Sequence, residues 1–551
     1  MYDYVIRGGT IVDGTGAPSY VGDLAIQGDR IAAIGVVEGT GAVEFDAAGR
    51  AVAPGFIDVH THYDAQMFWD PDLTPSSWHG ITTVVSGNCG FGLAPIRPEH
   101  RETMCQVLAG VEGMDLASLR TGIPWERYET FAEYLDLLES LPLTLNVGVL
   151  AGHTTLRLYA MGQDSMERAA TPEELEAMAG LLRDMLAEGA MGFSTSRETS
   201  HRSLDGRVAP SLVAELDELM RLCDVVGESG AGVIEITPGF PGRGLPNETL
   251  NEIARRTGRP LTWVALLTGK YSREEARRAL DETMGTGAEV WAQIGCKPMM
   301  FQVTLGDPYA FNNVPIFEEL VRLDHDGRRQ LYADGAWVVE AGRQITALRG
   351  EGMWATMFVQ ESTVHPDLVD GPRLSDLAEK AGVTPFEVMV ELSLAEDLRT
   401  RFGVILANGD EAGVAELLQD ERCLLGISDA GAHANQLCDA SYPTDLLGHW
   451  CRDLGALSLE QAVWRLTSHP AAVFGVVDRG ELRAGAYADV VVFDPGAVAE
   501  GPLERIADQP AGAERLVHRS EGIEATWING AQVVGGPATA VHPGRVLRSG
   551  A

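Results

Sequence analysis

The feature that most constrains the fold is an alternation of short apolar runs with amphipathic helical stretches between residues 55 and 427. The helical stretches include Pro172–Glu188 and Leu212–Val226. Strand-like runs that alternate with helices predict parallel β-α-β units, and eight such runs predict a (β/α)8 TIM barrel in the α/β class. Spacing alone leaves a doubly wound open sheet as the alternative. The eight runs are Gly55–Val59, Thr82–Val85, Thr144–Leu150, Met191–Ser194, Gly232–Ile236, Leu261–Leu266, Val290–Ile294 and Leu424–Ile427.

Both ends of the chain are rich in short strand-like runs joined by glycine and aspartate, which supply the positive φ of tight turns. Neither end is long enough to form a good core alone, so we predict that residues 1–53 and 480–551 combine into one small β-sandwich. The barrel then covers residues 54–479, with an insertion at about residues 297–418 that suits a lid before the last barrel strand. Three hairpins are predicted: Tyr4–Ile6 with Thr10–Val12, Leu24–Ile26 with Ile31–Ile34, and Ala525–Ile528 with Ala531–Val534.

Charge and cysteine usage narrow the class of protein. The chain carries 42 basic and 79 acidic residues, a net charge of −37, so its surface repels nucleic acid. No apolar run approaches the roughly 18 residues of a membrane span, and no secretory signal is visible at the N-terminus. The seven cysteines are scattered without CxxC pairs, which indicates reduced thiols. We expect a cytoplasmic protein with a small-molecule substrate and no nucleic-acid or membrane partner, and homo-oligomerisation stays open.

Two histidines follow the first predicted barrel strand, in the segment PGFIDVHTH that ends at His62. His60 and His62 are two residues apart, so their side chains leave an extended chain on the same side. Two imidazoles at a strand end are suitable ligands for a divalent metal ion. The alternative is a pair of hydrogen-bonded structural histidines.

Single residues after two other strands extend this potential site. Cys89, in SGNCG, lies just beyond the second run, where a nearby cation would favour the thiolate. Asp429, in SDAGAH, follows the last run, where a carboxylate can bind metal and transfer protons as a general base and then an acid. The carboxyl ends of barrel strands meet at one face, so these groups are expected together. A small buried cysteine and a helix N-cap aspartate are the alternatives.

Further polar residues near strand ends are weaker candidates. Glu235 is either a metal ligand or a buried, hydrogen-bonded carboxylate. His153, after the third run, is a candidate catalytic residue that would polarise a carbonyl, with a core histidine as the alternative. The sequence contains no P-loop, no GxGxxG after a strand and no GxSxG elbow. Four loop residues are candidates for substrate binding: Arg197, His201, Lys297 and His433.

Several segments resemble a known family. PGFIDVHTH, SDAGAH and the β-rich ends resemble the amidohydrolase superfamily, and SWHGITTVVSGNCGFGLAP, LAGHTTLRLYAMG and MGFSTS resemble its N-acyl-D-amino-acid deacylase (D-aminoacylase) group. The resemblance covers essentially the whole chain and implies a metal-carrying TIM barrel with a β-sandwich and an insertion. His60 and His62 match the family's HxH metal ligands, Cys89 its metal-binding cysteine, and Asp429 its catalytic aspartate.

The sequence departs from that group at its remaining metal ligands. The group places a metal-binding histidine after each of the fifth and sixth strands, but Gly232–Thr237 and Leu261–Ala265 contain none. The group also holds the substrate carboxylate with a basic residue and a tyrosine, which have no clear counterpart near Val264 or Lys297. Neither a two-metal site nor specificity for D-amino acids carries over from the resemblance.

The ligand count favours one metal ion. His60, His62 and Asp429 supply the three protein ligands of a usual catalytic zinc site, with Cys89 or Glu235 as a fourth. Zinc (Zn²⁺) is expected from this donor set, although manganese, iron or cobalt would also fit. We predict a metal-dependent hydrolase of C–N amide bonds, such as those of N-acyl amino acids. The alternatives are cyclic amide opening, decarboxylation or C–C hydrolysis on the same scaffold, and a non-catalytic scaffold.

Overall fold

The computed structural model of the chain describes residues 1–239, 244–284, 287–306, 308, 311, 314–536 and 541–549. The chain divides into two compact units. The larger unit comprises Met1–Lys297, Asp410–Ala434 and Cys438–Ala551, and the smaller comprises Pro298–Gly409 and Asn435–Leu437. Among the described residues, no helix combines the length and apolar character needed to cross a bilayer.

The larger unit contains two parallel sheets, which establish the α/β class. One has the order β17-β13-β12-β11-β10-β9 and the other the order β23-β8-β7-β6. Each of the eight predicted runs overlaps one of these strands, and the run Val290–Ile294 coincides with β13. The strands are β6 (Phe56–Asp58), β7 (Ile81–Ser86), β8 (Asn146–Val149), β9 (Ala151–Gly152), β10 (Gly192–Ser196), β11 (Val233–Thr237), β12 (Leu261–Trp263), β13 (Val290–Ile294), β17 (Cys423–Leu425) and β23 (Val546–Leu547).

Backbone contacts connect the two parallel sheets at two places. On one side only Leu150 separates β8 from β9, and Met191 N donates to Val149 O at 2.8 Å. On the other side the segments that follow β6 and β17 are joined by a parallel bridge between Thr61 and Ala430. In the same place Asp429 N donates to the His60 carbonyl at 3.2 Å. The histidine-bearing segment and the aspartate-bearing segment therefore lie side by side.

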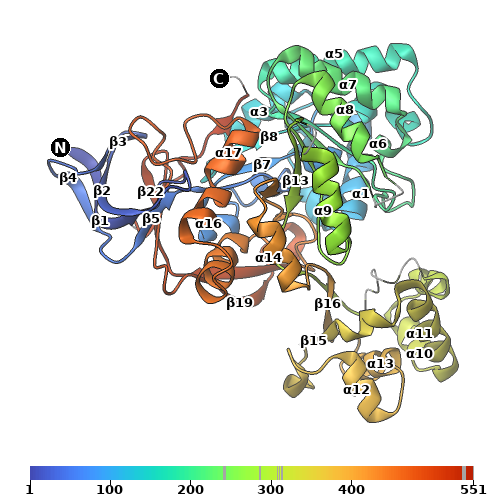
Figure 1. The fold of residues 1–551 in the computed structure, drawn as a ribbon. Helices are drawn as coiled ribbons and strands as arrows, with labels where there is room; N and C mark the ends of the chain where they lie inside the picture. Colours follow the sequence, from blue (N-terminus) through green and yellow to red (C-terminus); the bar gives the residue numbers. More distant parts are fainter. Residues whose placement is uncertain are drawn as a thin grey trace. The chain divides into compact units, whose positions relative to one another are not determined.

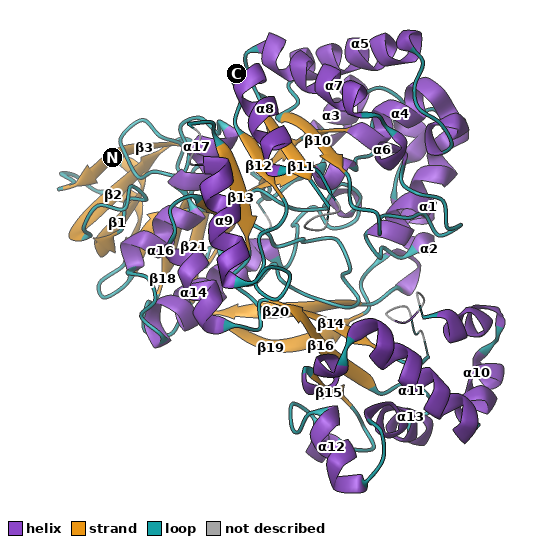
Figure 2. Cartoon of the chain, turned by 45° about the vertical axis from the view of Figure 1, so that its right-hand side comes forward, coloured by secondary structure: helices purple, strands orange, loops and turns teal. Residues whose placement is uncertain are grey.

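Helices pack on the outside of the parallel strands, as Figure 2 shows for α5 (Pro172–Glu188), α7 (Leu216–Ser229) and α8 (Asn247–Thr257). α5 has the bounds that the sequence predicts, because Thr171 and Glu174 form a capping box at its start. Gly189, at φ 113°, ends it in the left-handed conformation that glycine adopts freely.

The predicted helix over Leu212–Val226 is wrong at its start. The chain forms a short α6 (Pro210–Val213) and then becomes extended before α7 begins at Leu216. A half-buried arginine explains the interruption: Arg197 Nη1 donates to the carbonyl oxygens of Ser211 at 3.0 Å and Ala214 at 2.6 Å. These carbonyls are therefore satisfied outside a continuous helix.

Strands from both ends of the chain pair in one eight-stranded sheet of order β22-β21-β18-β5-β1-β2-β3, with β4 beside β1 (Figure 1). The predicted hairpins appear as β2–β3 and β21–β22. The hairpin predicted around Gly8 is wrong, because β1 runs through it with a bulge whose φ of 63° at Gly8 changes the register. The strands are β1 (Tyr2–Ile11), β2 (Tyr20–Gln27), β3 (Arg30–Gly35), β4 (Gly41–Asp46), β5 (Ala51–Pro54), β18 (Val490–Phe493), β21 (Ile523–Ile528) and β22 (Ala531–Val534).

The smaller unit has its own sheet and core. Its antiparallel sheet has the order β14-β16-β15, with β14 (Met299–Val303), β16 (Arg401–Ala407) and β15 (Met357–Glu361). Buried aromatic side chains, including Phe317 and Phe386, pack in its interior. Residues 411–418 of the predicted insertion fall instead in α14 (Glu411–Gln419) of the larger unit, since the apolar side of α14 joins that unit's core.

Candidate metal centre

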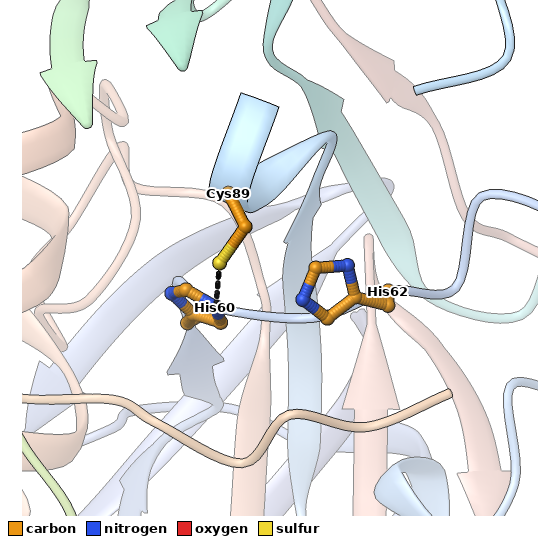
Figure 3. Close-up of side chains that lie close together, drawn as sticks. All are labelled: His60, His62 and Cys89. Atoms are coloured by element: carbon orange, nitrogen blue, oxygen red, sulfur yellow. Dashed lines mark hydrogen bonds between the residues drawn. The ribbon is translucent and has the colours of Figure 1, made fainter. Parts of the chain in front are cut away.

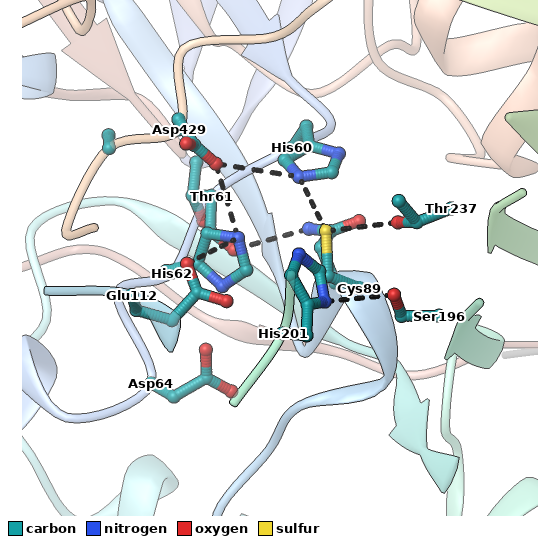
Figure 4. Close-up of polar contacts among 12 residues, drawn as sticks. His60, Thr61, His62, Asp64, Cys89, Glu112, Ser196, His201, Thr237 and Asp429 are labelled. Carbon is teal, nitrogen blue, oxygen red and sulfur yellow. Dashed lines mark hydrogen bonds and ion pairs between the residues drawn. The ribbon is translucent and has the colours of Figure 1, made fainter. Parts of the chain in front are cut away.

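Four potential ligand atoms converge beyond the end of β6 (Figures 3 and 4). His60 Nε2 lies 3.5 Å from Cys89 Sγ and 3.7 Å from Asp429 Oδ1, and His62 Nε2 lies 3.2 Å from the same Asp429 oxygen. Zinc bonds of about 2.0–2.3 Å place neighbouring donors of a tetrahedron about 3.3–3.8 Å apart. These three distances lie within about 0.1 Å of that range, so the donor atoms are spaced as ligands of a divalent metal ion would be.

His60 is held in the form that binds metal. Its Nδ1 lies 3.0 Å from Gln293 Oε1, and Gln293 Nε2 donates to Thr262 Oγ1 at 3.0 Å. Since the Gln293 oxygen accepts, Nδ1 carries the proton and the Nε2 lone pair is left for the ion. Burial lowers the pKa of His60 to about 4, which keeps the ring neutral.

Cys89 enters the cluster from a short 3-10 helix, η3 (Asn88–Gly90), directly after β7. Its φ of 55° is left-handed, a conformation rare for this residue type and concentrated at functional sites. Thr237 Oγ1 donates to its sulfur at 3.3 Å, and Cys89 N donates to Glu235 Oε2 at 2.8 Å. Thr237 and Glu235 are two residues apart on β11, so both point at Cys89 from one face of that strand.

Glu235 contacts the backbone of Cys89 rather than the two histidines. It is fully buried, and burial raises the pKa of its carboxyl to about 8. Its Oε1 has no hydrogen-bond partner among the described residues. Glu235 thus supports the cysteine loop. Among the described residues, the clusters of potential metal ligands contain His60, His62, Cys89, Glu112 and Asp429 but not Glu235.

Asp429 is the ligand candidate that faces solvent. Its side chain is 25% exposed, whereas those of His60 and His62 are 1% exposed. Its φ of 53° is left-handed, so the backbone turns sharply just after β17 and presents the carboxylate to the cluster. A carboxylate that is both at the ion and open to water is suited to proton transfer.

Glu112 is a member of the site that sequence reasoning missed. It caps the end of α1 (Arg101–Val111), is 4% exposed, and places Oε2 3.6 Å from His62 Nε2 (Figure 4). Burial raises the pKa of this carboxyl to about 7. No strand-end position or ligand spacing marks Glu112 in the sequence, because it arrives from the end of a helix.

Two of the four candidates for substrate binding lie beside the cluster. His201 Nδ1 lies 2.8 Å from Ser196 Oγ, and its ring faces Cys89 and His62 in Figure 4. His433 is half-buried on the Asp429 loop, and its backbone N donates to the Glu112 carbonyl at 2.6 Å.

Both ring nitrogens of His153 are engaged by residues outside the cluster. Its Nδ1 lies 2.8 Å from Thr195 Oγ1 and its Nε2 lies 2.8 Å from Glu218 Oε1. Glu218 also accepts from Arg157, which completes a buried polar network between α4 (His153–Met161) and α7. Both ring nitrogens are therefore engaged, and this geometry supports the core-histidine alternative.

The last two candidates are engaged in other contacts as well. Arg197 binds the carbonyl oxygens before α7, as described above. Lys297 Nζ donates to Ser441 Oγ at 2.7 Å and to Glu500 Oε2 at 2.5 Å, in a partly buried ion pair. These contacts engage the Arg197 guanidinium and the Lys297 ammonium group, and none of the contacted residues belongs to the histidine cluster.

Comparisons with known proteins agree with this geometry: the chain belongs to the amidohydrolase family, whose pattern matches residues 43–534. It is 32% identical to a D-aminoacylase of Alcaligenes xylosoxydans xylosoxydans over 99% of this chain and 97% of that protein. The chain is also similar to a solved N-acyl-D-glutamate deacylase of Bordetella bronchiseptica, with 30% identity, a TM-score of 0.68 and 99% coverage of both chains. That structure is a complex with zinc and a phosphonate inhibitor that mimics the tetrahedral intermediate. A solved D-aminoacylase with a binuclear centre, for which one-metal activation and second-metal attenuation are reported, is 28% identical, with TM-score 0.66 and full coverage of both.

Proposed function

We propose that the protein hydrolyses the amide bond of N-acyl amino acids at a single divalent ion held by His60, His62, Cys89 and Asp429. The observation that carries this proposal is a set of three distances of 3.2–3.7 Å, which link Cys89 Sγ to His60 Nε2, His60 Nε2 to Asp429 Oδ1, and Asp429 Oδ1 to His62 Nε2. The relatives support the substrate class, because a D-aminoacylase and an N-acyl-D-glutamate deacylase each match at about a third identity along nearly the whole chain.

In this proposal Asp429 moves the proton. A divalent ion at the cluster supplies Lewis acidity to the amide carbonyl and lowers the pKa of water. The partly exposed carboxylate of Asp429 accepts a proton from the attacking water as the new C–O bond forms. It then donates that proton to the amide nitrogen as the C–N bond breaks, which releases a carboxylic acid and an amine. His201 and His433 border the position where the substrate would lie.

One ion rather than two is proposed, with zinc as the metal. Thr237 occupies the end of β11 and donates to the Cys89 sulfur, and Trp263 ends β12, so neither strand end brings an imidazole. The one-metal activation reported for a solved D-aminoacylase supports a single ion as sufficient for this chemistry.

The proposed scaffold is one closed (β/α)8 barrel over residues 54–479, with the insertion before its last strand. Support comes from the backbone bonds that join the β6 and β17 segments and the β8 and β10 segments. Residues 1–53 and 480–551 are proposed to form the β-sandwich, on the pairing of β5 with β18.

The test is a substrate panel run on protein whose metal content has been measured. Purified protein is expected to carry about one zinc per chain and to hydrolyse N-acyl-D-amino acids, and chelation is expected to abolish the activity. Cyclic amides and N-acyl-L-amino acids serve as comparison substrates. Activity that survives complete metal removal, or turnover confined to cyclic amides, would contradict the proposal.

A further inference from the structure

A buried carboxylate lies on the His62 side of the centre. Glu112 Oε2 is 3.6 Å from His62 Nε2, which is itself 3.2 Å from Asp429 Oδ1. The ligand atoms of these three residues all lie within 4.8 Å of one another. His62 Nε2 is buried and makes no well-formed hydrogen bond within the described residues, so it is directed at this space. Glu112 therefore borders the same space as two of the four proposed ligands, His62 and Asp429.

The chain holds Glu112 in place from both sides. Its backbone N closes the last turn of α1 by donating to Leu108 O at 2.9 Å, and its carbonyl accepts from His433 N at 2.6 Å. Gly113 follows with φ 60°, and a Cβ there would lie 2.6 Å from His433 Nδ1. Only glycine allows the segment between α1 and α2 (Leu116–Gly122) to come this close to the Asp429 loop.

When Glu112 is ionised, its charge requires a partner. A buried carboxylate is costly unless a positive charge offsets it. Among the described residues its ion-pair partner is His62. A histidine that binds metal through Nε2 is neutral, however, and then offers no charge to Glu112. The bound cation itself is the positive charge that remains at this position.

We propose that Glu112 is a direct ligand of the ion, an oxygen donor supplied by the end of α1 where β11 and β12 supply no histidine. This inference rests on the proposed function, because it assumes that His60, His62, Cys89 and Asp429 bind an ion. It gives the ion five protein ligands, with one more carboxylate than the four-donor set.

The test measures zinc affinity by competition with a chromophoric chelator, using the full-length protein. Glu112→Gln keeps the side-chain shape and removes the charge, and Glu102→Gln on the exposed side of α1 is the matched control. Loss of a ligand is expected to weaken zinc binding more than about 100-fold, beyond the 10–100-fold effect of residues that only support ligands. The control is expected to bind zinc as the wild type does.

Cobalt(II) substitution gives a second readout. Its visible absorption intensifies as the coordination number falls, so cobalt-loaded Glu112→Gln is expected to absorb more strongly than the cobalt-loaded wild type. Should this variant fail to fold, Gly113→Ala replaces it, since the added methyl displaces the Glu112 loop from His433 and leaves every donor group present; weakened zinc binding is expected again.

The outcomes separate this inference from the proposed function. Wild-type affinity in Glu112→Gln, or a loss of less than about 100-fold with an unchanged cobalt spectrum, would refute Glu112 as a ligand. The single-ion hydrolase would then stand on its four remaining donors. A wild-type protein that binds no zinc would instead overturn the proposed function itself.

Discussion

Replacing Asp429 by asparagine separates the chemistry of this carboxylate from its structural role. Asp429 has φ 53°, a left-handed conformation that asparagine tolerates about as well as aspartate, so the turn after β17 is expected to persist. One side-chain oxygen remains for the ion. The proton acceptor is lost, together with the negative charge 3.2 Å from His62 Nε2.

Loss of a general base and acid typically slows turnover by about 10²–10⁴-fold. At about 1.36 kcal/mol per factor of ten, the barrier is expected to rise by about 2.7–5.4 kcal/mol. The assay is kcat on an N-acyl-D-amino acid, together with zinc content measured on the same samples. Asp478→Asn is a suitable control, because Asp478 also has a left-handed φ of 55° but its carboxylate pairs with Arg30 of β3 at 3.2 Å rather than with the histidine cluster. An Asp429→Asn enzyme with full zinc content and unchanged kcat would refute the role of Asp429 in proton transfer.

Three further predictions concern the metal centre and its surroundings. Gln293→Leu removes the acceptor that orients His60 and is expected to weaken zinc binding about 10–100-fold, measured by chelator competition. Glu218→Gln leaves the buried Arg157 without its anionic partner and is expected to cost about 3–5 kcal/mol in urea unfolding, with kcat of the folded enzyme unchanged; unaltered stability would refute this. Chelated protein is expected to lose activity and regain it on adding about one equivalent of zinc, and no recovery with any divalent ion would contradict the account.

Periodicity in the sequence identifies most of the larger unit's parallel strands and α5. In these elements the apolar pattern and the helix caps come from residues that are neighbours in the sequence. It fails where distant groups decide the backbone. The interruption before α7 depends on Arg197, which comes from the end of β10. The bulge in β1 depends on Asp23, whose Oδ1 accepts from Gly8 N at 2.9 Å. Neither contact is visible in the local pattern that suggested a continuous helix and a hairpin.

The site residues likewise divide into those that the local sequence indicates and one that it does not. His60, His62, Cys89 and Asp429 are found from sequence because each follows a predicted strand, and strand ends meet on one face of such a fold. Glu112 is not found, since it reaches the cluster from the end of a helix and is held there by His433.

Equally, the sequence does not indicate that partners from β10 and α7 occupy both ring nitrogens of His153. That ring is therefore engaged in a buried network, although its position after a strand suggested a catalytic group.

The most direct test of the account is a crystal structure of the zinc-loaded protein with anomalous data collected on both sides of the zinc absorption edge. One anomalous peak is expected per chain, at about 2.0–2.3 Å from His60 Nε2, His62 Nε2, Cys89 Sγ and Asp429 Oδ1. A peak away from these four donor atoms, or zinc-free histidines hydrogen-bonded only to the protein, would contradict the single-ion centre.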